Sequence, residues 1–546
     1  MLLVVGWDGA SLDVVEPLLE AGRLPALAEL IQRGAVRPVR STRPPVTYPA
    51  WTSFLTGCHP WRHALVDFAV REGYRIRFLS ARDRRVPTLW ARMGAAGLKV
   101  GLYGVPATYP PEPLRGIVVP GFDTPFGAAS KPATHPPDLG HRLIARYGTL
   151  AVQGPQQLRI DRGWHARALA TMLEQIERRT GIVCDLLARE RFDAFFVYYG
   201  ESDTVAHHFW HFSDPSSPRY DPNGDPEAVA RVYGALDAAL ARLCAAAGSS
   251  ANVVVISDHG SGGTSDRAVF WNRWLADHGW LAFKPQGPLR WTAVKRSLLR
   301  AVPPRAAGPL FRRLQPLAAR VESGSRFSGI DWKKTLVFSQ ELPYDSGLCF
   351  NLKGREPSGT VEPRQVEELF ERLRTQLLAF RDPTDGGRVV ESVALVDEPE
   401  RSARGVDVEL SLRLPGGYSY AAGSSRAGRE RVALRRLQPE EMSGARGSSM
   451  PGSHRELGLC VLSGPGVARG RFGVGTLADA GATVLALAGF DAGAEIDGRP
   501  WLELLAEGGA KALGSQENLP CGPGGRASPG EERELAETLR ALGYVR

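Results

Sequence analysis

The sequence predicts an α/β protein with a doubly wound, mostly parallel sheet, helices on both faces of that sheet, and an inserted subdomain. The chain opens with a continuous apolar run, Leu2–Trp7, of the kind that forms a buried parallel strand. Two further runs, at residues 193–199 and 252–257, have the same character, and helical patterns separate the three runs. Strands that alternate with helices in this way form βαβ units in a parallel sheet.

Local signals predict each element in turn. After the first strand comes a helix whose apolar face contains Leu12, Val15 and Leu19. Gly22 ends this helix, and residues 25–34 form a second helix that begins with a proline. The later elements expected in this half of the chain are a helix at 48–56, a strand at 98–103, a helix at 164–190, the strand at 193–199, a helix from 225 to 248 and the strand at 252–257.

The second half of the chain is less regular. Residues 285–330 are rich in arginine and poor in acids, and they form either a solvated helical face or a patch for an anionic partner. Residues 331–440 read as an insertion of short strands and loops, after which a strand at 460–463 and a helix at 483–488 return to the core. The predicted organisation is a catalytic α/β core at 1–284, a basic helical segment and inserted cap-like region at 285–440, a return of the core at 441–506, a flexible linker at 507–530, and a C-terminal docking helix at 531–546 with the apolar stripe Leu535, Leu539 and Leu542.

The composition is that of a soluble globular protein. Of 546 residues, 43% are hydrophobic and 23% are charged, which is sufficient for a large core. The formal net charge of +8 comes mainly from arginine and suits anionic substrates, but the sequence contains no nucleic-acid-binding motif. The six cysteines are scattered without a CxxC pair, no apolar run is long enough for a transmembrane segment, and the first residues do not form a signal peptide. We therefore expect a cytoplasmic protein.

The stretch RPPVTYPAWTSFLTG, from Arg43 to Gly57, contains a candidate nucleophile. Pro49 suits a first helical turn and Gly57 suits a helix end, so we expect a helix with Thr47 at its N-cap. A hydroxyl at that place faces unpaired backbone N–H groups and the positive end of the helix dipole, which favour its alkoxide and the phosphate that it attacks. Threonine is also an ordinary N-cap residue, so this stretch alone does not distinguish a nucleophile from a cap.

Acidic residues and histidines follow the three apolar strands, and parallel strands collect such ends on one edge of a sheet. Two of these residues, Asp203 and His207, are four positions apart, which places both on one face of a helical turn. With a histidine from a later glycine-flanked loop, the set supplies enough oxygen and nitrogen ligands for two zinc-like divalent ions, with manganese as the alternative. The candidate ligands are Asp8, Asp203, His207, Asp258, His259 and His454.

In their order along the chain, these motifs resemble the alkaline phosphatase superfamily. Within it, they resemble the type I phosphodiesterase/nucleotide pyrophosphatase branch and the bacterial proteins described as phosphohydrolases or phosphomutases. The resemblance covers nearly the whole chain except the final linker and helix. The segments that carry it are VVGWDGAS, PPVTYPAWTSFLTG, SDTVAHHFW, ISDHG and GSHRELG, with FNLKGREP, SGPGV, TVLALAG and IDGRP also similar.

The resemblance implies a metal-dependent hydrolase of phosphate esters. It implies that Thr47 attacks phosphorus in line and forms a phosphothreonine intermediate, which water then hydrolyses. It further implies two metal ions, one surrounded by Asp8, Thr47, Asp258 and His259 and the other by Asp203, His207 and His454.

Two features of the sequence depart from related patterns. Nucleotide pyrophosphatases carry an asparagine downstream of the nucleophile that helps to hold a phosphate oxygen, whereas residues 66–68 here read Val-Asp-Phe, which weakens the inference to nucleotide substrates. Residues 58–62 fit the Cys-x-Pro-x-Arg pattern that sulfatases oxidise to formylglycine. In sulfatases that cysteine precedes a helix ending in Thr-Gly, but here Thr-Gly precedes Cys58, so Thr47 occupies the nucleophile's place.

These features predict a class of substrate rather than one molecule. We expect hydrolysis of phosphodiester or pyrophosphate bonds in a phosphorylated small molecule or a lipid headgroup. The alternatives are a phosphomonoesterase or phosphomutase on the same scaffold and, from another class, a non-catalytic binding protein. The candidate substrate contacts, all in the FNLKGREP segment, are Asn351, Lys353 and Arg355.

Overall fold

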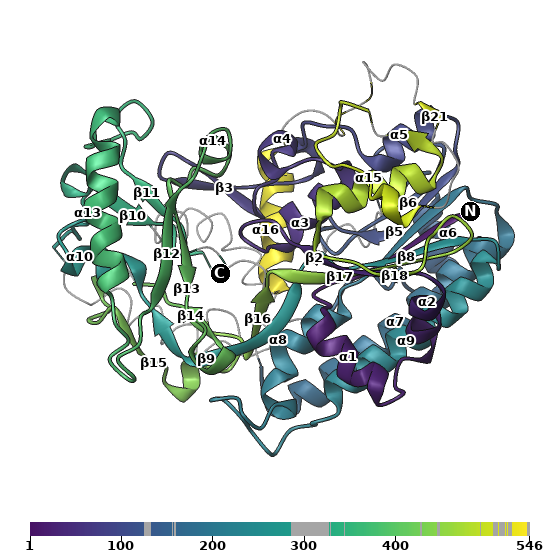
Figure 1. Ribbon diagram of the computed structural model, residues 1–546, viewed down its shortest axis with the longest axis horizontal. Helices are drawn as coiled ribbons and strands as arrows, with labels where there is room; N and C mark the ends of the chain where they lie inside the picture. The colour runs from purple at the N-terminus through teal and green to yellow at the C-terminus, as the bar shows by residue number, and fades with distance from the viewer. Residues whose placement is uncertain are drawn as a thin grey trace.

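The computed structural model divides into a larger lobe built on the central sheet and a smaller lobe formed by the inserted region (Figure 1). Most of the arginine-rich stretch predicted at 285–330 lies outside the described residues, and so does much of the linker predicted at 507–530. No helix among the described residues combines the length and the apolar character needed to cross a membrane. The structure describes residues 1–546 apart from 125–132, 156, 158–159, 286–326, 328, 343, 345, 426–427, 445–447, 492, 506–510, 513–518, 520, 522, 524–526 and 543–546.

The central sheet confirms the predicted doubly wound architecture. β1 (Leu2–Trp7) lies between β7 (Ala194–Tyr199) and β8 (Asn252–Ile256) and is parallel to both. β17 (Leu457–Ser463) is antiparallel to both of its neighbours, so the sheet is mostly rather than wholly parallel. Among the described residues the strand order is β18-β2-β17-β8-β1-β7-β5-β6 with β19 also paired to β2, and the remaining strands are β2 (Ala35–Arg40), β5 (Val100–Val105), β6 (Gly116–Pro120), β18 (Gly470–Arg471) and β19 (Gly475–Thr476).

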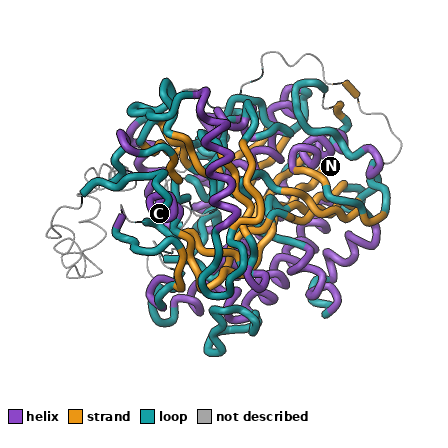
Figure 2. Tube along the Cα trace, turned by 60° about the vertical axis from the view of Figure 1, so that its left-hand side comes forward, coloured by secondary structure: helices purple, strands orange, loops and turns teal. Residues whose placement is uncertain are grey.

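Helices cover both faces of this sheet because alternate strand residues point to opposite sides. In β1, Leu3 and Val5 belong to one apolar cluster, whereas Leu2 and Val4 belong to the other. Figure 2 shows helices on both sides of the strands. The first layer consists of α1 (Leu12–Glu20), α2 (Pro25–Arg33), α6 (Leu139–Tyr147), α7 (Trp164–Arg189), α8 (Glu201–Ser213) and α9 (Ala228–Ala247), and the second of α3 (Thr47–Thr56), the short α4 (Pro60–His63), α5 (Leu89–Ala95), α15 (Leu477–Leu487) and α16 (Pro529–Ala541).

The helix predicted at 483–488 begins earlier in the structure. α15 starts at Leu477 and is capped by Thr476, whose hydroxyl accepts a hydrogen bond from the backbone of Asp479 at 3.2 Å. Its first turns were missed because their residues are small and lack an apolar stripe. The small size has a packing reason, since a Cβ at Gly481 would lie 2.2 Å from the carbonyl oxygen of Phe54 on α3.

The C-terminal helix α16 packs on the layer that contains α3. Leu535 and Leu539 of this helix, and Leu542 directly after it, are buried in the same cluster as the apolar side chains of α3. Glu532 of α16 also accepts a hydrogen bond from the backbone of Phe78 at 3.1 Å. The helix is therefore joined to the core by both apolar and polar contacts.

The inserted region is reached along one long strand. β9 (Gly260–Val269) leaves the core after β8 and pairs near its start with β16 (Gly452–Arg455). Further along, β9 pairs with β14 (Ser419–Ala422) and β15 (Leu434–Arg436). Between Val269 and Leu434, most buried apolar side chains form a separate core. The other elements of this lobe are α10 (Trp271–Asp277), α13 (Val366–Ala379), α14 (Glu400–Arg404) and a sheet in the order β10 (Val337–Ser339), β11 (Leu348–Phe350), β13 (Val408–Leu412) and β12 (Val390–Leu395).

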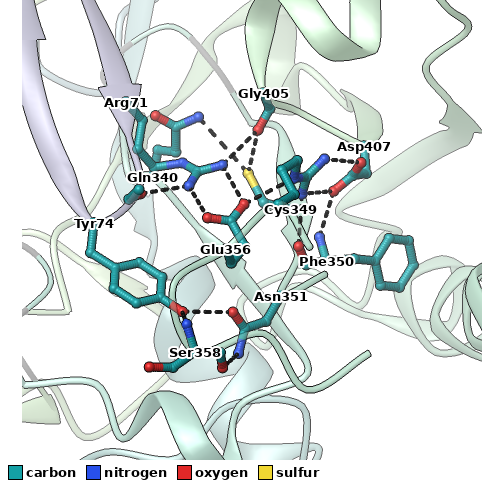
Figure 3. A network of polar contacts seen from close by, with 12 residues as sticks. Arg71, Tyr74, Gln340, Cys349, Phe350, Asn351, Glu356, Ser358, Gly405 and Asp407 are labelled. Carbon is teal, nitrogen blue, oxygen red and sulfur yellow. Dashed lines mark hydrogen bonds and ion pairs between the residues drawn. The ribbon is translucent and has the colours of Figure 1, made fainter. Parts of the chain in front are cut away.

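A hairpin of the core, β3 (Ala69–Glu72) and β4 (Arg75–Phe78), is fastened to the inserted lobe by buried polar contacts (Figure 3). The guanidinium of Arg71 donates to both carboxylate oxygens of Glu356, at 2.5 and 2.8 Å, and the two side chains are 4% and 1% exposed. Tyr74, in the hairpin turn, stacks on Trp332 with ring centroids 3.7 Å apart. A buried bidentate pair of this kind fixes the geometry between the segments that it joins.

Candidate metal centre and nucleophile

Six buried side chains gather beyond the carboxyl ends of β1, β7 and β8. They form two groups of three, and within each group the potential ligand atoms all lie within 4.8 Å of one another. The six side chains are those named as candidate ligands from the sequence. The first group is Asp8, Asp258 and His259, and the second group is Asp203, His207 and His454.

Adjacent parallel strands assemble the first group. Asp8 follows β1 and Asp258 follows β8, and because these strands pair with each other their ends lie side by side. The Nε2 atom of His259 lies 3.3 Å from Oδ1 of Asp8 and 3.3 Å from Oδ2 of Asp258. Ligand atoms around a tetrahedral zinc ion, with bonds of about 2 Å, are about 3.3 Å apart. The first group therefore has the dimensions of a site for one ion.

The second group joins α8 to β16. Asp203 and His207 lie one turn apart on α8, as their spacing predicted. His454 reaches them because β16 pairs with β9. The Nε2 atom of His207 lies 3.2 Å from Oδ1 of Asp203 and 2.9 Å from Nε2 of His454, and the latter atom lies 3.5 Å from the same carboxylate oxygen. This triangle also matches the spacing of ligands around one ion.

Backbone carbonyls orient all three histidines. In each ring Nδ1 is bonded to a carbonyl oxygen, which only accepts, so Nδ1 carries the proton and the neutral ring presents an Nε2 lone pair. Metal-binding histidines are commonly oriented in this way. The facing Nε2 atoms of His207 and His454 are 2.9 Å apart, which is repulsive unless a proton or a metal cation lies between their lone pairs. The carbonyl partners are Gly452 for His207 at 3.0 Å, Gly260 for His259 at 3.0 Å and Pro45 for His454 at 2.5 Å.

Several buried atoms of this centre make no hydrogen bond within the described part of the chain. Each such atom costs about 1–3 kcal/mol of folding free energy, and a cluster of them indicates the place of a bound ion. Burial, with the charge of Asp203, raises the pKa of Asp8 to about 8, and burial with the charge of Asp8 raises that of Asp258 well above its ordinary value. Crowded carboxylates of this kind need cations, so the donor set fits divalent ions. The unbonded atoms are Thr47 Oγ1, Asp8 Oδ1, Asp203 Oδ1, Asp258 Oδ2 and His259 Nε2.

The candidate nucleophile is the first residue of α3. The prediction that Thr47 is the N-cap is wrong, because Val46, at φ −120° and ψ 138°, has the extended cap conformation and helical dihedral angles begin one residue later. The side chain of Thr47 is fully buried and caps nothing. Its hydroxyl is therefore available to a reaction partner.

The three candidate substrate contacts make their bonds within the protein. Asn351 donates to three backbone oxygens and accepts a hydrogen bond from Tyr74 at 2.9 Å (Figure 3). Lys353 and Arg355 each form an ion pair with an acidic side chain. Since all three side chains are engaged in this way, their contact with a substrate stays a prediction. The acidic partners are Glu362 for Lys353 at 2.5 Å and Asp407 for Arg355 at 2.7 Å.

One side chain of the inserted lobe lies against the second group. Tyr344 stacks on His454 with ring centroids 4.0 Å apart and an angle of 6° between the rings. Its hydroxyl lies 3.4 Å from Nε2 of His207. Nothing in the sequence around Tyr344 indicated this position, because a single tyrosine in an irregular segment carries no motif.

Two aromatic side chains of the core also belong to the site. Trp51 and Tyr198 both donate hydrogen bonds to the carboxylate of Asp8. Trp51 comes four residues after Thr47 and so lies on the same face of α3. This spacing in the sequence already indicated that Trp51 lies near the nucleophile. The sequence indicated no role for Tyr198 beyond that of a buried strand residue.

The sulfatase-like pattern at residues 58–62 spans the turn that follows α3 and the start of the short helix α4. Cys58 is buried, and burial raises the pKa of its thiol. Arg62 forms an ion pair with Asp497 at 2.7 Å. A buried thiol with a raised pKa is a poor nucleophile, so this segment is structural.

No curated protein matches the sequence of this chain. The family described as type I phosphodiesterase / nucleotide pyrophosphatase matches residues 2–404, which is most of the chain. The chain belongs to this family. Membership confirms the resemblance carried by the motifs and makes the chain a phosphoric ester hydrolase of the alkaline phosphatase superfamily. The family is metal-dependent, and the two groups described above are the candidate metal-binding residues.

Several solved structures are similar to this chain. Phosphonoacetate hydrolase from Sinorhizobium meliloti 1021, in complex with phosphonoformate, is 16% identical, with a TM-score of 0.52 over 89% of this chain and 95% of that chain. Human ectonucleotide pyrophosphatase / phosphodiesterase 5 is 13% identical, with a TM-score of 0.44 over 93% and 100% of the two chains. The wild-type alkaline phosphatase PafA is 12% identical, with a TM-score of 0.49 over 92% and 98%. At 16% identity, the likeness to the hydrolase shows the fold alone.

Proposed function

We propose that this chain hydrolyses phosphodiester or pyrophosphate bonds through a phosphothreonine intermediate at Thr47, with two divalent ions, zinc or alternatively manganese, as cofactors. The observation that carries the proposal is the buried, unbonded hydroxyl of Thr47 in a segment that contacts both groups, through Trp51 to Asp8 and through Pro45 to His454, together with the spacing of the ligand atoms in those groups. The residues that would hold the ions are Asp8, Thr47, Asp258 and His259 for one and Asp203, His207 and His454 for the other.

The reaction has two displacements at phosphorus. In the first, Oγ1 of Thr47 attacks, the bond from phosphorus to the leaving oxygen breaks, and the proton of the hydroxyl is released to the leaving group or to solvent. In the second, water attacks the phosphothreonine, which releases the phosphorylated product and restores the hydroxyl. When bound, the divalent ions supply Lewis acidity that favours the alkoxide and offsets charge on the phosphoryl oxygens.

The scaffold also contributes to the first displacement. Thr47 begins a helix of ten residues, so its hydroxyl and the phosphate lie at the positive end of the α3 dipole. Its burial excludes water from the nucleophile, and the helix fixes its position relative to the ligands.

A cleft beside His454 supports a diester rather than a monoester substrate. The cleft has a volume of about 380 Å³ and lies between residues 42–45 of the core and strands β13 and β14 of the inserted lobe. Tyr344 and Trp271 contribute aromatic surface to it. A phosphomonoester has one substituent on phosphorus, whereas a diester has a second one that needs such a space. The mixed aromatic and polar lining suits a phosphorylated small molecule or a lipid headgroup.

The replacement Thr47→Ala tests the nucleophile. We expect turnover of a generic aryl phosphodiester to fall about 10⁴-fold or more, while the protein remains folded and still binds two zinc ions. Thr52→Ala is the matched control, because Thr52 lies on the same helix, is buried, and bonds only the carbonyl of Tyr48, at 2.7 Å. Mass spectrometry of quenched wild-type enzyme should find phosphate on Thr47. Unchanged turnover in Thr47→Ala would remove Thr47 from the mechanism.

The same assays distinguish the alternatives on this scaffold. A phosphomonoesterase would hydrolyse an aryl phosphomonoester faster than the diester. A phosphomutase or phosphotransferase would pass the phosphoryl group to an added alcohol in preference to water. Our proposal requires faster diester hydrolysis and release of the product to water.

We further propose that the protein acts in the cytoplasm. All six cysteines, which lie among the described residues, are free thiols, as is usual in a reducing compartment. Cell fractionation tests this location.

A further inference from the structure

The carboxylate of Asp8 is held by two side chains that were not among the candidate site residues. The hydroxyl of Tyr198 donates to Oδ2 of Asp8 at 2.6 Å, and Nε1–H of Trp51 donates to the same oxygen at 3.1 Å. The other oxygen, Oδ1, makes no hydrogen bond and lies 3.3 Å from Nε2 of His259. The two oxygens of the Asp8 carboxylate therefore have different roles. Oδ2 accepts hydrogen bonds from the protein, and Oδ1 lies beside His259 of the first group.

We propose that Trp51 and Tyr198 are positioning residues that set the affinity of the first group for its metal ion. This inference rests on the proposed function. With two donors on Oδ2, the carboxylate cannot rotate without breaking two buried hydrogen bonds. Its remaining oxygen is thereby kept in place as a ligand, and partners of this kind typically account for 10–100-fold in metal affinity.

The fold provides for both donors. Tyr198 lies opposite Gly6 in the β1–β7 pair, two residues before Asp8, so its ring lies next to the acid along the sheet. Trp51 comes from α3, and its ring meets that of Tyr198 edge to face, with centroids 5.3 Å apart and an interplanar angle of 84°. The two rings are 2% and 4% exposed. Packed in this way, the rings present both donors from fixed directions.

Gly6 makes room for this arrangement. A Cβ at Gly6 would lie 2.5 Å from Cη2 of Trp51, which is closer than such atoms approach. The rim of the indole at Cη2 therefore occupies the space that a side chain at Gly6 would take, and its Nε1–H reaches the acid two residues further along. Trp51 thus links the helix that carries Thr47 to the ligand Asp8, so the nucleophile and the first group are built as one unit.

The test uses the full-length protein, freed of metal and titrated calorimetrically with Zn²⁺ alone. We expect Tyr198→Phe and Trp51→Phe each to weaken zinc binding at one of the two sites 10–100-fold, with the other site unchanged as an internal reference. Tyr199→Phe is the matched control. It removes a hydroxyl from the next residue of β7, one that bonds Thr180 at 2.7 Å and lies away from Asp8, and it should bind zinc like the wild type.

A double-mutant cycle separates positioning from a general structural role. If Trp51 acts through Asp8, adding Trp51→Phe to Asp8→Asn produces no further loss of zinc affinity, whereas independent losses would multiply. Wild-type affinity in folded Tyr198→Phe overturns the proposal, as does an equal loss in Tyr199→Phe. If Trp51→Phe fails to fold, Tyr198→Phe decides the matter alone. A wild-type protein that binds no zinc would instead contradict the proposed function.

Discussion

The two ligand groups differ in what holds their side chains. In the second group, His207 and His454 donate to backbone carbonyls. In the first group, His259 also donates to a backbone carbonyl, but the carboxylate of Asp8 accepts hydrogen bonds from the side chains of Trp51 and Tyr198. Side-chain replacement cannot delete a backbone carbonyl, but it can delete an indole N–H or a phenol hydroxyl. The first group can therefore be tuned through the two donors to Asp8, whereas the histidines of the second group are held by the path of the chain at Pro45 and β16, with Tyr344 stacked on His454.

Among the variants that test this difference between the two groups, Asp203→Asn has the largest expected effect on zinc binding and turnover. Oδ1 of Asp203 lies within 3.5 Å of both histidines of the second group, so no backbone contact can replace it. We expect one of two zinc ions to be lost and turnover to fall about 10³-fold or more, as measured by metal analysis and diester hydrolysis. Asp214→Asn, at the end of the same helix, is the control. Two ions retained in Asp203→Asn would remove this carboxylate from the group.

Gly6→Ala should weaken the first group alone. The added methyl displaces Trp51, so we expect about tenfold weaker zinc binding at one site and a loss of about 1–3 kcal/mol in stability. Gly101→Ala provides the comparison, because its Cβ would lie 2.3 Å from Phe195, on a strand pair away from the ligands. Both variants should melt earlier, but calorimetry should detect weaker zinc binding in Gly6→Ala only. Equal zinc affinity in Gly6→Ala and Gly101→Ala would contradict the inference that neighbouring side chains set the affinity of the first group.

Arg71→Met should affect stability and leave both groups intact. It removes the bidentate partner of Glu356, a side chain that is 1% exposed, and we expect a loss of about 3 kcal/mol in chemical denaturation. Arg77→Met, on the other strand of the hairpin, breaks two more exposed pairs, with Glu72 and Asp83, and should cost less, about 1 kcal/mol. A change in zinc stoichiometry in Arg71→Met would show that the inserted lobe contributes to the ligand geometry.

Lys353→Ala has the smallest expected effect. Its ion pair with Glu362 is exposed, so the melting temperature and the zinc content should match those of the wild type. If Lys353 contacts the substrate as predicted, KM rises while kcat is unchanged. An unchanged KM would assign the residue to the surface of the inserted lobe.

The sheet and the ligand candidates were predictable because their signals are local. Apolar runs that end in acids indicate strands and one edge of a sheet, and the spacing of Asp203 and His207 indicates one face of a helix. The structure brings these residues together as the topology requires. The order of the motifs then carried the family resemblance, which is confirmed for residues 2–404.

The remaining features depend on contacts between distant segments. The prediction that Thr47 is the N-cap was wrong because the backbone becomes helical at Thr47 itself, which a sequence pattern does not reveal to within one residue. The start of α15 was not predicted because its residues are small, which allows the helix to pack closely on α3. The donors to Asp8 come from a helix and a neighbouring strand, and Tyr344 comes from another lobe. Apart from Trp51, which is four residues from Thr47, these partners have no fixed spacing in the sequence, so composition and periodicity do not identify them.

The first residues of β9 limit where the inserted lobe can be exchanged for that of another protein in order to change substrate specificity. Between Gly260 and Gly263 the strand pairs with β16, the strand that carries His454. From Thr264 onward it pairs with β14, which lines the cleft. A graft that joins the chains after Thr264 and before Gly452 retains the ligand geometry, whereas one made nearer to His259 would replace part of the metal centre together with the lobe.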